Sequence, residues 1–195
     1  MDILSATVTL FFIMDPLGNI PLFMSVLKSV PAERRRRVLV REILFAYLVL
    51  LSGVFLGGPL LRLLALEEES VAMAGGIVLF IVALRMIFPG EPVAGSDHTD
   101  EEPFLVPLAI PLFAGPSALA AVLLLQRTAP GQIVPLLTAV TVAWALSGAI
   151  LLSSTFFYRV LRERGLIAVE RLMGMLLIGI AVQMFMNGLK AFMSQ

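Results

Sequence analysis

A seven-residue run near position 18 places an acid, two prolines, a glycine and an amide inside an otherwise apolar stretch. It reads DPLGNIP, from Asp15 to Pro21. Proline removes a backbone donor and clashes with the preceding helical turn, and glycine is the poorest ordinary helix former. The run therefore predicts non-helical backbone at residues 16–19. The N–H groups of Gly18, Asn19 and Ile20 would then begin a new half-helix and attract a carboxylate or another anion.

Asp15 carries the only charge of this run. A carboxylate near the middle of a bilayer costs at least about 2.5 kcal/mol on insertion scales, so it needs a partner, a proton or a wet pocket. We expect Asp15 to face a substrate ammonium group, a coupling cation or a transported proton. The alternative is a structural ion pair or a cap for the half-helix that follows. Asn19 can donate and accept, which suits a zwitterion, and its alternative role is also capping.

A second apolar stretch contains a similar cluster of helix breakers, Pro107, Pro111, Gly115 and Pro116. It predicts non-helical backbone at residues 115–117. The N–H groups of Ser117 and Ala118, together with Gly115, would form a second candidate binding site. For either cluster the simpler alternative is a proline kink.

Both clusters lie in segments long enough to span a membrane. The chain has 195 residues, of which 59% are hydrophobic and 14% charged, whereas soluble domains are nearer half apolar and a quarter charged. A spanning helix needs about 20 mainly apolar residues. Six segments qualify: Ile3–Leu27, Val38–Leu64, Ser70–Phe88, Phe104–Gln126, Ile133–Tyr158 and Leu172–Met193. The sequence thus predicts an all-α membrane protein with six transmembrane helices, of which the first and fourth are interrupted.

The composition argues against several other classes of protein. The chain has no cysteine, one histidine and a formal net charge of zero. Disulfides and thiolate metal sites are excluded, and no basic face is available for nucleic acid. We expect no enzyme activity, no metal and no cofactor, apart from Na⁺ or H⁺ as a coupling ion. His98 lies in an acidic stretch that we interpret as a solvated loop.

Basic residues indicate the orientation. The first, third and fifth connections hold 10 of the 14 lysines and arginines, the opposite side holds 3, and Arg85 lies within a span. Cytoplasmic loops are enriched in these residues, so both termini should be non-cytoplasmic. The four arginines at 34–37 would also contact anionic lipid headgroups.

A weak internal repeat divides the chain. A shift of 100 aligns Pro16 with Pro116, and a shift of 98 aligns Gly76 with Gly174 and Leu79 with Leu177. Each copy holds three spans, so the second must enter the membrane from the opposite face, as in many secondary transporters. We predict a first repeat at 1–90, an acidic linker at 91–103 and an inverted repeat at 104–195. The alternative is chance similarity between apolar segments.

Two polar side chains occupy equivalent positions in the third and sixth spans, Arg85 and Gln183. Arg85 could pair with Asp15 or a substrate carboxylate, or its side chain could extend to the membrane surface instead. Gln183 lies one turn before Asn187, and hydrogen bonding between helices is the expected role of these two amides. The sequence leaves the oligomeric state open, with a homo-oligomer as one possible arrangement.

Several segments of the chain resemble the MarC family of bacterial and archaeal membrane proteins. They are the DPLGNIP run, the Gly75-Gly76 start and the Ala83–Ile87 end of the third span, and Ala114–Pro116. The resemblance spans nearly the whole chain. It implies six spans in the inner membrane and, for SnatA-like members, uptake of small neutral amino acids such as glycine or alanine, driven by a cation or proton gradient. Ser117 is a departure, because many relatives would have glycine there.

These observations favour a secondary transporter for a small zwitterion, working by alternating access, with lipid as its surroundings. An ion channel or exporter is the first alternative, and a non-transporting membrane scaffold is the second.

Overall fold

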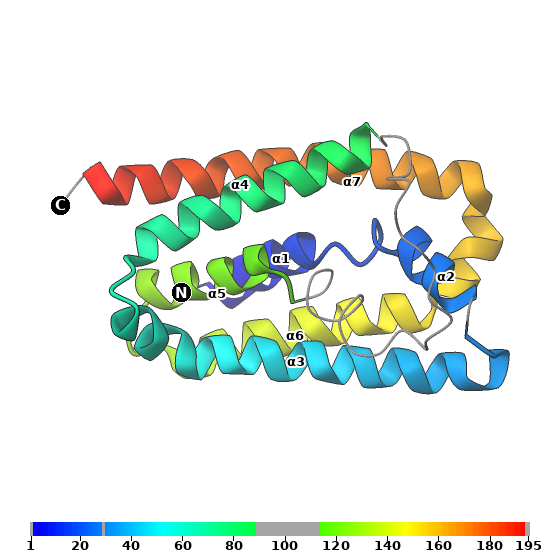
Figure 1. The fold of residues 1–195 in the computed structure, drawn as a ribbon, viewed down its shortest axis with the longest axis horizontal. Helices are drawn as coiled ribbons and strands as arrows, with labels where there is room; N and C mark the ends of the chain where they lie inside the picture. The colour runs from blue at the N-terminus through cyan, green and yellow to red at the C-terminus, as the bar shows by residue number, and fades with distance from the viewer. Residues whose placement is uncertain (1, 29, 89–113, 194–195) are drawn as a thin grey trace.

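The computed structural model describes residues 2–28, 30–88 and 114–193, and in these ranges every regular element is a helix. The helices are α1 (Ile3–Met14), α2 (Ile20–Lys28), α3 (Ala32–Leu63), α4 (Glu68–Ile87), α5 (Pro116–Thr128), α6 (Ile133–Leu152) and α7 (Ser154–Met193) (Figure 1). Four of them, α3, α4, α6 and α7, contain segments long and apolar enough to cross a membrane, and α1 and α5 are shorter apolar helices. The predicted all-α class is confirmed.

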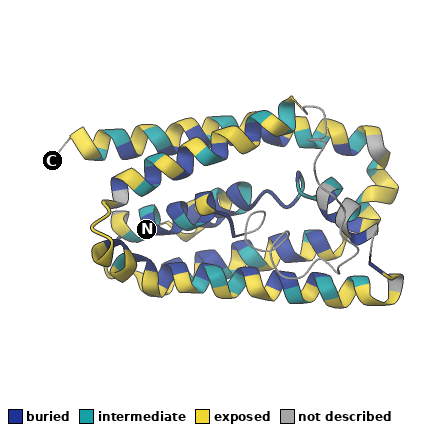
Figure 2. Cartoon of the chain, viewed as in Figure 1, coloured by how far each residue is buried: buried dark blue, intermediate teal, exposed yellow. Residues whose placement is uncertain are grey.

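The helices form three layers. Figure 1 shows α1 and α5 between the pair α4–α7 and the pair α3–α6, and the contacts between the elements agree. Both termini lie at one end of the molecule, and α2 lies towards the other. The inner layer is largely buried, whereas the long helices expose apolar side chains on their outer faces (Figure 2). Such extensive exposed apolar surface is expected of a protein surrounded by lipid.

Two glycines bring α4 and α7 into close contact. A Cβ built on Gly76 would lie 2.9 Å from the carbonyl oxygen of Ala181, and one built on Gly174 would lie 3.0 Å from the carbonyl oxygen of Ala83. Any larger residue would force the two backbones apart, as is typical of small residues at membrane helix crossings. Gly76 and Gly174 therefore permit the close packing of α4 against α7.

Several predicted boundaries are wrong because the helices continue into charged sequence. The arginines at 34–37 lie on α3, which begins at Ala32, and most of the predicted basic connection at 159–171 belongs to α7. α7 nevertheless consists of two helical segments that meet at a kink at Arg162 (φ 53°, ψ −179°), so the predicted connection between the fifth and sixth spans does contain a break. Arginine and glutamate are good helix formers, so charge alone does not end a helix. The fifth span ends at Leu152 instead of Tyr158. The acidic linker and residues 104–113 lie outside the described residues.

Candidate functional site

The first interruption begins where α1 ends. Asp15 adopts the left-handed conformation (φ 42°, ψ 61°), which is uncommon outside glycine but tolerated by aspartate. Pro16 disfavours the helical conformation at the residue before it, which ends α1 at Met14. Residues 16–19 form a turn and α2 starts at Ile20, so the predicted non-helical backbone is present.

Asp15 and Asn19 close this interruption with their own polar groups. Asp15 is only 4% exposed, and its Oδ1 accepts a hydrogen bond from the N–H of Gly18 at 3.1 Å. The Nδ2 of Asn19 donates to the carbonyl oxygen of Met14 at 3.0 Å and thereby satisfies the end of α1. Both side chains therefore stabilise the turn between α1 and α2, although the Asp15 carboxylate bonds to a residue before α2 and does not cap that helix itself.

The N–H groups predicted to bind an anion at this turn already have acceptors. Gly18 donates to the Asp15 carboxylate, Asn19 donates to the Asp15 carbonyl at 3.1 Å, and Ile20 donates to the Leu17 carbonyl at 3.3 Å. In this conformation the start of α2 therefore has no N–H group of these three left for a ligand.

Gly18 lets the carboxylate of Asp15 lie against the turn. A Cβ added at Gly18 would overlap both Oδ2 of Asp15 and the terminal methyl group of Met86 on α4. A side chain at this position would displace one or both. The turn is thus packed directly against the end of α4.

The second interruption has a different form. Ala114 and Gly115 are non-helical, and α5 begins at Pro116. Ser117 is therefore helical, contrary to our prediction, because proline fits the first position of a helix and fixes a suitable φ. Ser117 is 9% exposed and Ala118 is 1% exposed.

The start of α5 presents backbone donors. The first turn of a helix leaves its N–H groups without intrahelical acceptors, and no side-chain cap is found here within the described part of the chain. The N–H groups of Ser117 and Ala118 thus remain suited to an anion.

The other two predicted residues, Arg85 and Gln183, lie on exposed helix faces. The ion pairs found among the described residues do not include Asp15. The Nε2 of Gln183 donates to Oδ1 of Asn187 at 2.8 Å. The structure therefore brings Asp15, Gly18 and Asn19 together, and none of the hydrogen bonds or ion pairs found among the described residues joins Arg85 or Gln183 to them.

Two acidic residues were missed by the sequence analysis. Glu170 on α7 is half-buried. Glu69 is 3% exposed and forms an ion pair with Arg127 of α5. The predicted topology had placed both residues in connections between spans. Glu69 and Arg127 have opposite charges and were predicted on the same side of the membrane, which could have indicated that they pair.

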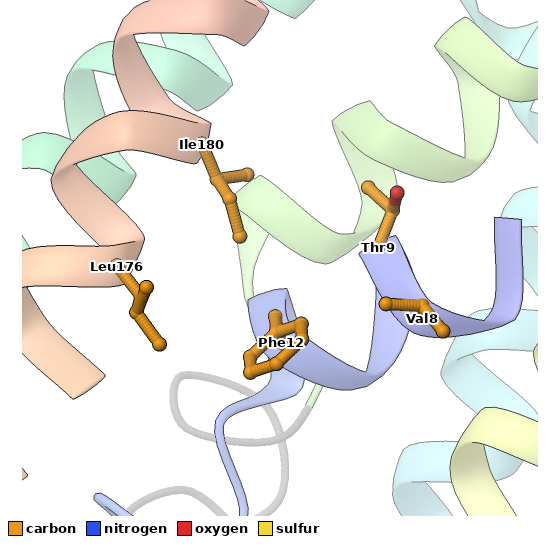
Figure 3. Close-up of a pocket in the computed structure, with 5 residues that line it drawn as sticks. All are labelled: Val8, Thr9, Phe12, Leu176 and Ile180. Atoms are coloured by element: carbon orange, nitrogen blue, oxygen red, sulfur yellow. The ribbon is translucent and has the colours of Figure 1, made fainter. Parts of the chain in front are cut away.

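A cavity of about 310 Å³ lies between α1 and α7. It is lined by Val8, Thr9, Phe12, Leu176 and Ile180 (Figure 3). The Thr9 hydroxyl already donates to the carbonyl oxygen of Ser5 at 2.9 Å. The cavity is thus nearly apolar and includes none of the predicted site residues, which makes it unsuited to a small zwitterion.

The fold and this site define an all-helical integral membrane protein with a buried, charged break in an apolar helix. The chain belongs to the MarC family: the family described as "MarC family integral membrane protein" matches residues 1–193. The resemblance inferred from the sequence is confirmed.

Three relatives illustrate the range of similarity. The chain is 49% identical over 193 residues to the UPF0056 inner membrane protein YhgN of Escherichia coli K12, covering 98% of each chain. It is 45% identical over 194 residues to a UPF0056 membrane protein of Buchnera aphidicola subsp. Baizongia pistaciae, covering 98% of each. A UPF0056 membrane protein of Aquifex aeolicus is 32% identical over 196 residues, covering 95% of this chain and 91% of the relative. No solved structure matches the chain.

Proposed function

We propose that this protein is a secondary transporter of small neutral amino acids of the glycine and alanine class, coupled to Na⁺ or H⁺. The observation that carries the proposal is the buried carboxylate of Asp15 at a helix break inside an apolar protein. Non-helical backbone at membrane depth is tolerated only where protein or a wet cavity surrounds it. Discontinuous helices of this kind hold substrates and ions in secondary transporters.

The two interruptions would bind opposite ends of the substrate. The N–H groups of Ser117 and Ala118 lack a side-chain cap in the described region and would receive the carboxylate. Asp15 would face the ammonium group or the coupling ion. Gly18, Asn19 and Ile20 would hold Asp15 in place and take part in binding only if their turn rearranges.

Reciprocal contacts between α4 and α7 support an inverted repeat of six spans. Gly76 approaches Ala181, and Gly174 approaches Ala83. Gly174 lies 98 positions after Gly76, and Ala181 lies 98 positions after Ala83. Exchange of the two helices therefore reproduces the same contacts, as a two-fold axis between repeats requires. We propose that residues 1–90 and 104–195 are the two repeats and that they move against each other during transport.

The proposed topology places both termini outside the cytoplasm, as the excess of lysine and arginine in the other connections suggests. A green fluorescent protein fused to the C-terminus should stay dark, because it does not mature when exported unfolded. An exported phosphatase at the same position should be active. A bright fluorescent fusion would contradict this orientation.

Uptake into proteoliposomes tests the function. The purified protein should take up radiolabelled glycine or alanine with saturation under an imposed Na⁺ or H⁺ gradient, and unlabelled substrate inside should accelerate entry. Protein-free liposomes are the control. A current without exchange would indicate a channel. The absence of any flux, with correctly inserted protein, would favour a scaffold and overturn the proposal.

A further inference from the structure

Two exposed amide side chains lie on α7, in a segment that is otherwise mostly apolar. Gln183 and Asn187 are both exposed, and they belong to the segment Arg164–Met193, which is long and apolar enough to span a membrane. Gln183 is about 18 Å along the helix from Arg171 at 1.5 Å per residue. It therefore lies near the middle of about 30 Å of hydrocarbon.

Gln183 is also at the centre of a stripe of exposed residues with alternating spacings of four and three. This α7 stripe consists of Leu172, Leu176, Gly179, Gln183, Met186 and Lys190, all exposed. One of them, Leu176, also lines the edge of the cavity between α1 and α7. That spacing aligns residues along one side of a helix and is the pattern by which two parallel helices pack. No described atom lies within 4 Å of a Cβ added at Gly179. Its missing side chain serves no contact with the described part of the chain and leaves room for a neighbouring helix.

The amide pair keeps unused hydrogen-bonding capacity. Gln183 donates one N–H to Oδ1 of Asn187. An amide has two donors and one acceptor oxygen, so the oxygen of Gln183 and N–H groups of both residues have no hydrogen-bond partner among the residues that the structure describes. Lipid tails offer nothing to these groups, and unsatisfied polar groups in hydrocarbon are costly. Polar side chains on membrane helices accordingly promote helix association.

We propose that the α7 stripe is the interface between two copies of this protein. Copies inserted in the same orientation are related by a two-fold axis along the membrane normal, which places each residue opposite itself at the same depth. An amide opposite an identical amide can donate and accept at once, so Gln183 is complementary to its own copy. This self-complementarity favours a second copy over a different protein, and the inference does not depend on transport.

The absence of cysteine from the chain makes a clean cross-linking test possible. Single substitutions Gly179→Cys and Met186→Cys introduce one thiol each on the α7 stripe. Val142→Cys, at an exposed position in the middle of α6, is the matched control. Oxidation in native membranes at low expression should give a disulfide-linked dimer for both stripe variants and little for the control.

The role of Gln183 needs a second measurement. Gln183→Leu, combined with Met186→Cys, should lower the association constant in liposomes about three- to tenfold, as expected for interhelical hydrogen bonds in membranes. Gln183→Asn should retain most of the association. All variants lie on an exposed face, and equal membrane levels exclude misfolding.

Four outcomes would overturn the proposal. They are the absence of dimer at both stripe positions, equal cross-linking of the α6 control, an adduct of a different mass, and unchanged association of Gln183→Leu.

Discussion

The two interrupted helices differ in how their freed backbone groups are satisfied. At the first interruption, Asp15 and Asn19 supply side-chain partners, and the N–H groups of residues 18–20 all find acceptors within the turn. At the second, α5 begins directly on Pro116, and no side-chain cap is found in the described residues. The first interruption therefore satisfies its backbone N–H groups internally, whereas the second has backbone N–H groups that can bind a ligand.

This difference separates two tasks that a single helix break could have combined. A closed turn holds a carboxylate rigidly, because the position of Asp15 is determined by Gly18 on one side and Met86 on the other. An uncapped helix start can bind and release an anion without breaking protein hydrogen bonds. Under the proposed function, the first interruption would hold a fixed negative charge and the second would bind the exchangeable ligand.

The largest expected effect is that of Asp15→Asn. Asparagine keeps an acceptor for the Gly18 N–H and nearly the same shape, but it removes the charge. Uptake should fall to background while membrane insertion is unchanged. Asp2→Asn is the matched control, because Asp2 also accepts backbone hydrogen bonds, from Leu4 and Ser5, at the exposed start of α1. Wild-type uptake and ion dependence for Asp15→Asn at equal protein level would contradict the proposed role of the charge.

Gly18→Ala should have the next largest effect. The added methyl group overlaps the Asp15 carboxylate and Met86, so the carboxylate must move, and a misplacement of about 1 Å can cost on the order of a hundredfold in rate at a catalytic centre. We expect uptake to fall at least about tenfold. Gly58→Ala adds the same methyl group to α3, where no described atom lies within 4 Å of the new Cβ, and should leave uptake unchanged. Equal uptake by both variants would mean that the position of Asp15 is not critical.

Gly115→Ser tests the open character of the second interruption. Gly115 has extended dihedrals (φ −64°, ψ 171°), which a serine can adopt. Its hydroxyl would cap α5 and stabilise the protein by roughly a few tenths of a kcal/mol relative to glycine, but it would compete with a substrate carboxylate for the same N–H groups. We expect a higher melting temperature together with a several-fold higher KM.

Gly115→Ala separates capping from bulk, because it adds a Cβ without an acceptor. If both variants raise KM equally, side-chain volume is responsible, and the donors at Ser117 and Ala118 lose their proposed role.

Much of this fold follows from local properties of the sequence. Long apolar segments predict helices, and the proline and glycine cluster predicts the break at residues 16–19. The ends of α3 and α7 could not be predicted from polarity, because arginine-rich sequence continues a helix as readily as apolar sequence does. The acidic residues before Ser70 were likewise assigned to a connection, although α4 begins at Glu68.

The candidate site could be predicted only in part. The DPLGNIP run indicates that Asp15 and Asn19 lie together, but the saturation of its N–H groups depends on the left-handed conformation of Asp15, which the sequence does not specify. The contact of Gly18 with Met86 and the ion pair of Glu69 with Arg127 join residues far apart in the chain. Contacts of that kind depend on packing between helices, which no local pattern encodes.

Asn19→Ala should have the smallest effect on uptake. It tests whether only the charge of Asp15 takes part in transport, while the other residues of the first interruption stabilise the fold. The substitution removes the hydrogen bond from Asn19 to the Met14 carbonyl. A buried acceptor left without a partner costs about 1–3 kcal/mol, so the melting temperature should fall by several degrees. Uptake by the folded fraction should stay within about threefold of wild type. A direct contact with the substrate worth about 1 kcal/mol would change the affinity more than that, by about fivefold.

Asn19→Asp is the informative companion, because it removes the donor and adds a second charge beside Asp15, and it should be more destabilising. Loss of uptake in Asn19→Ala without loss of stability would show that Asn19 contacts the substrate directly, and the distinction between a closed and an open interruption would then fail.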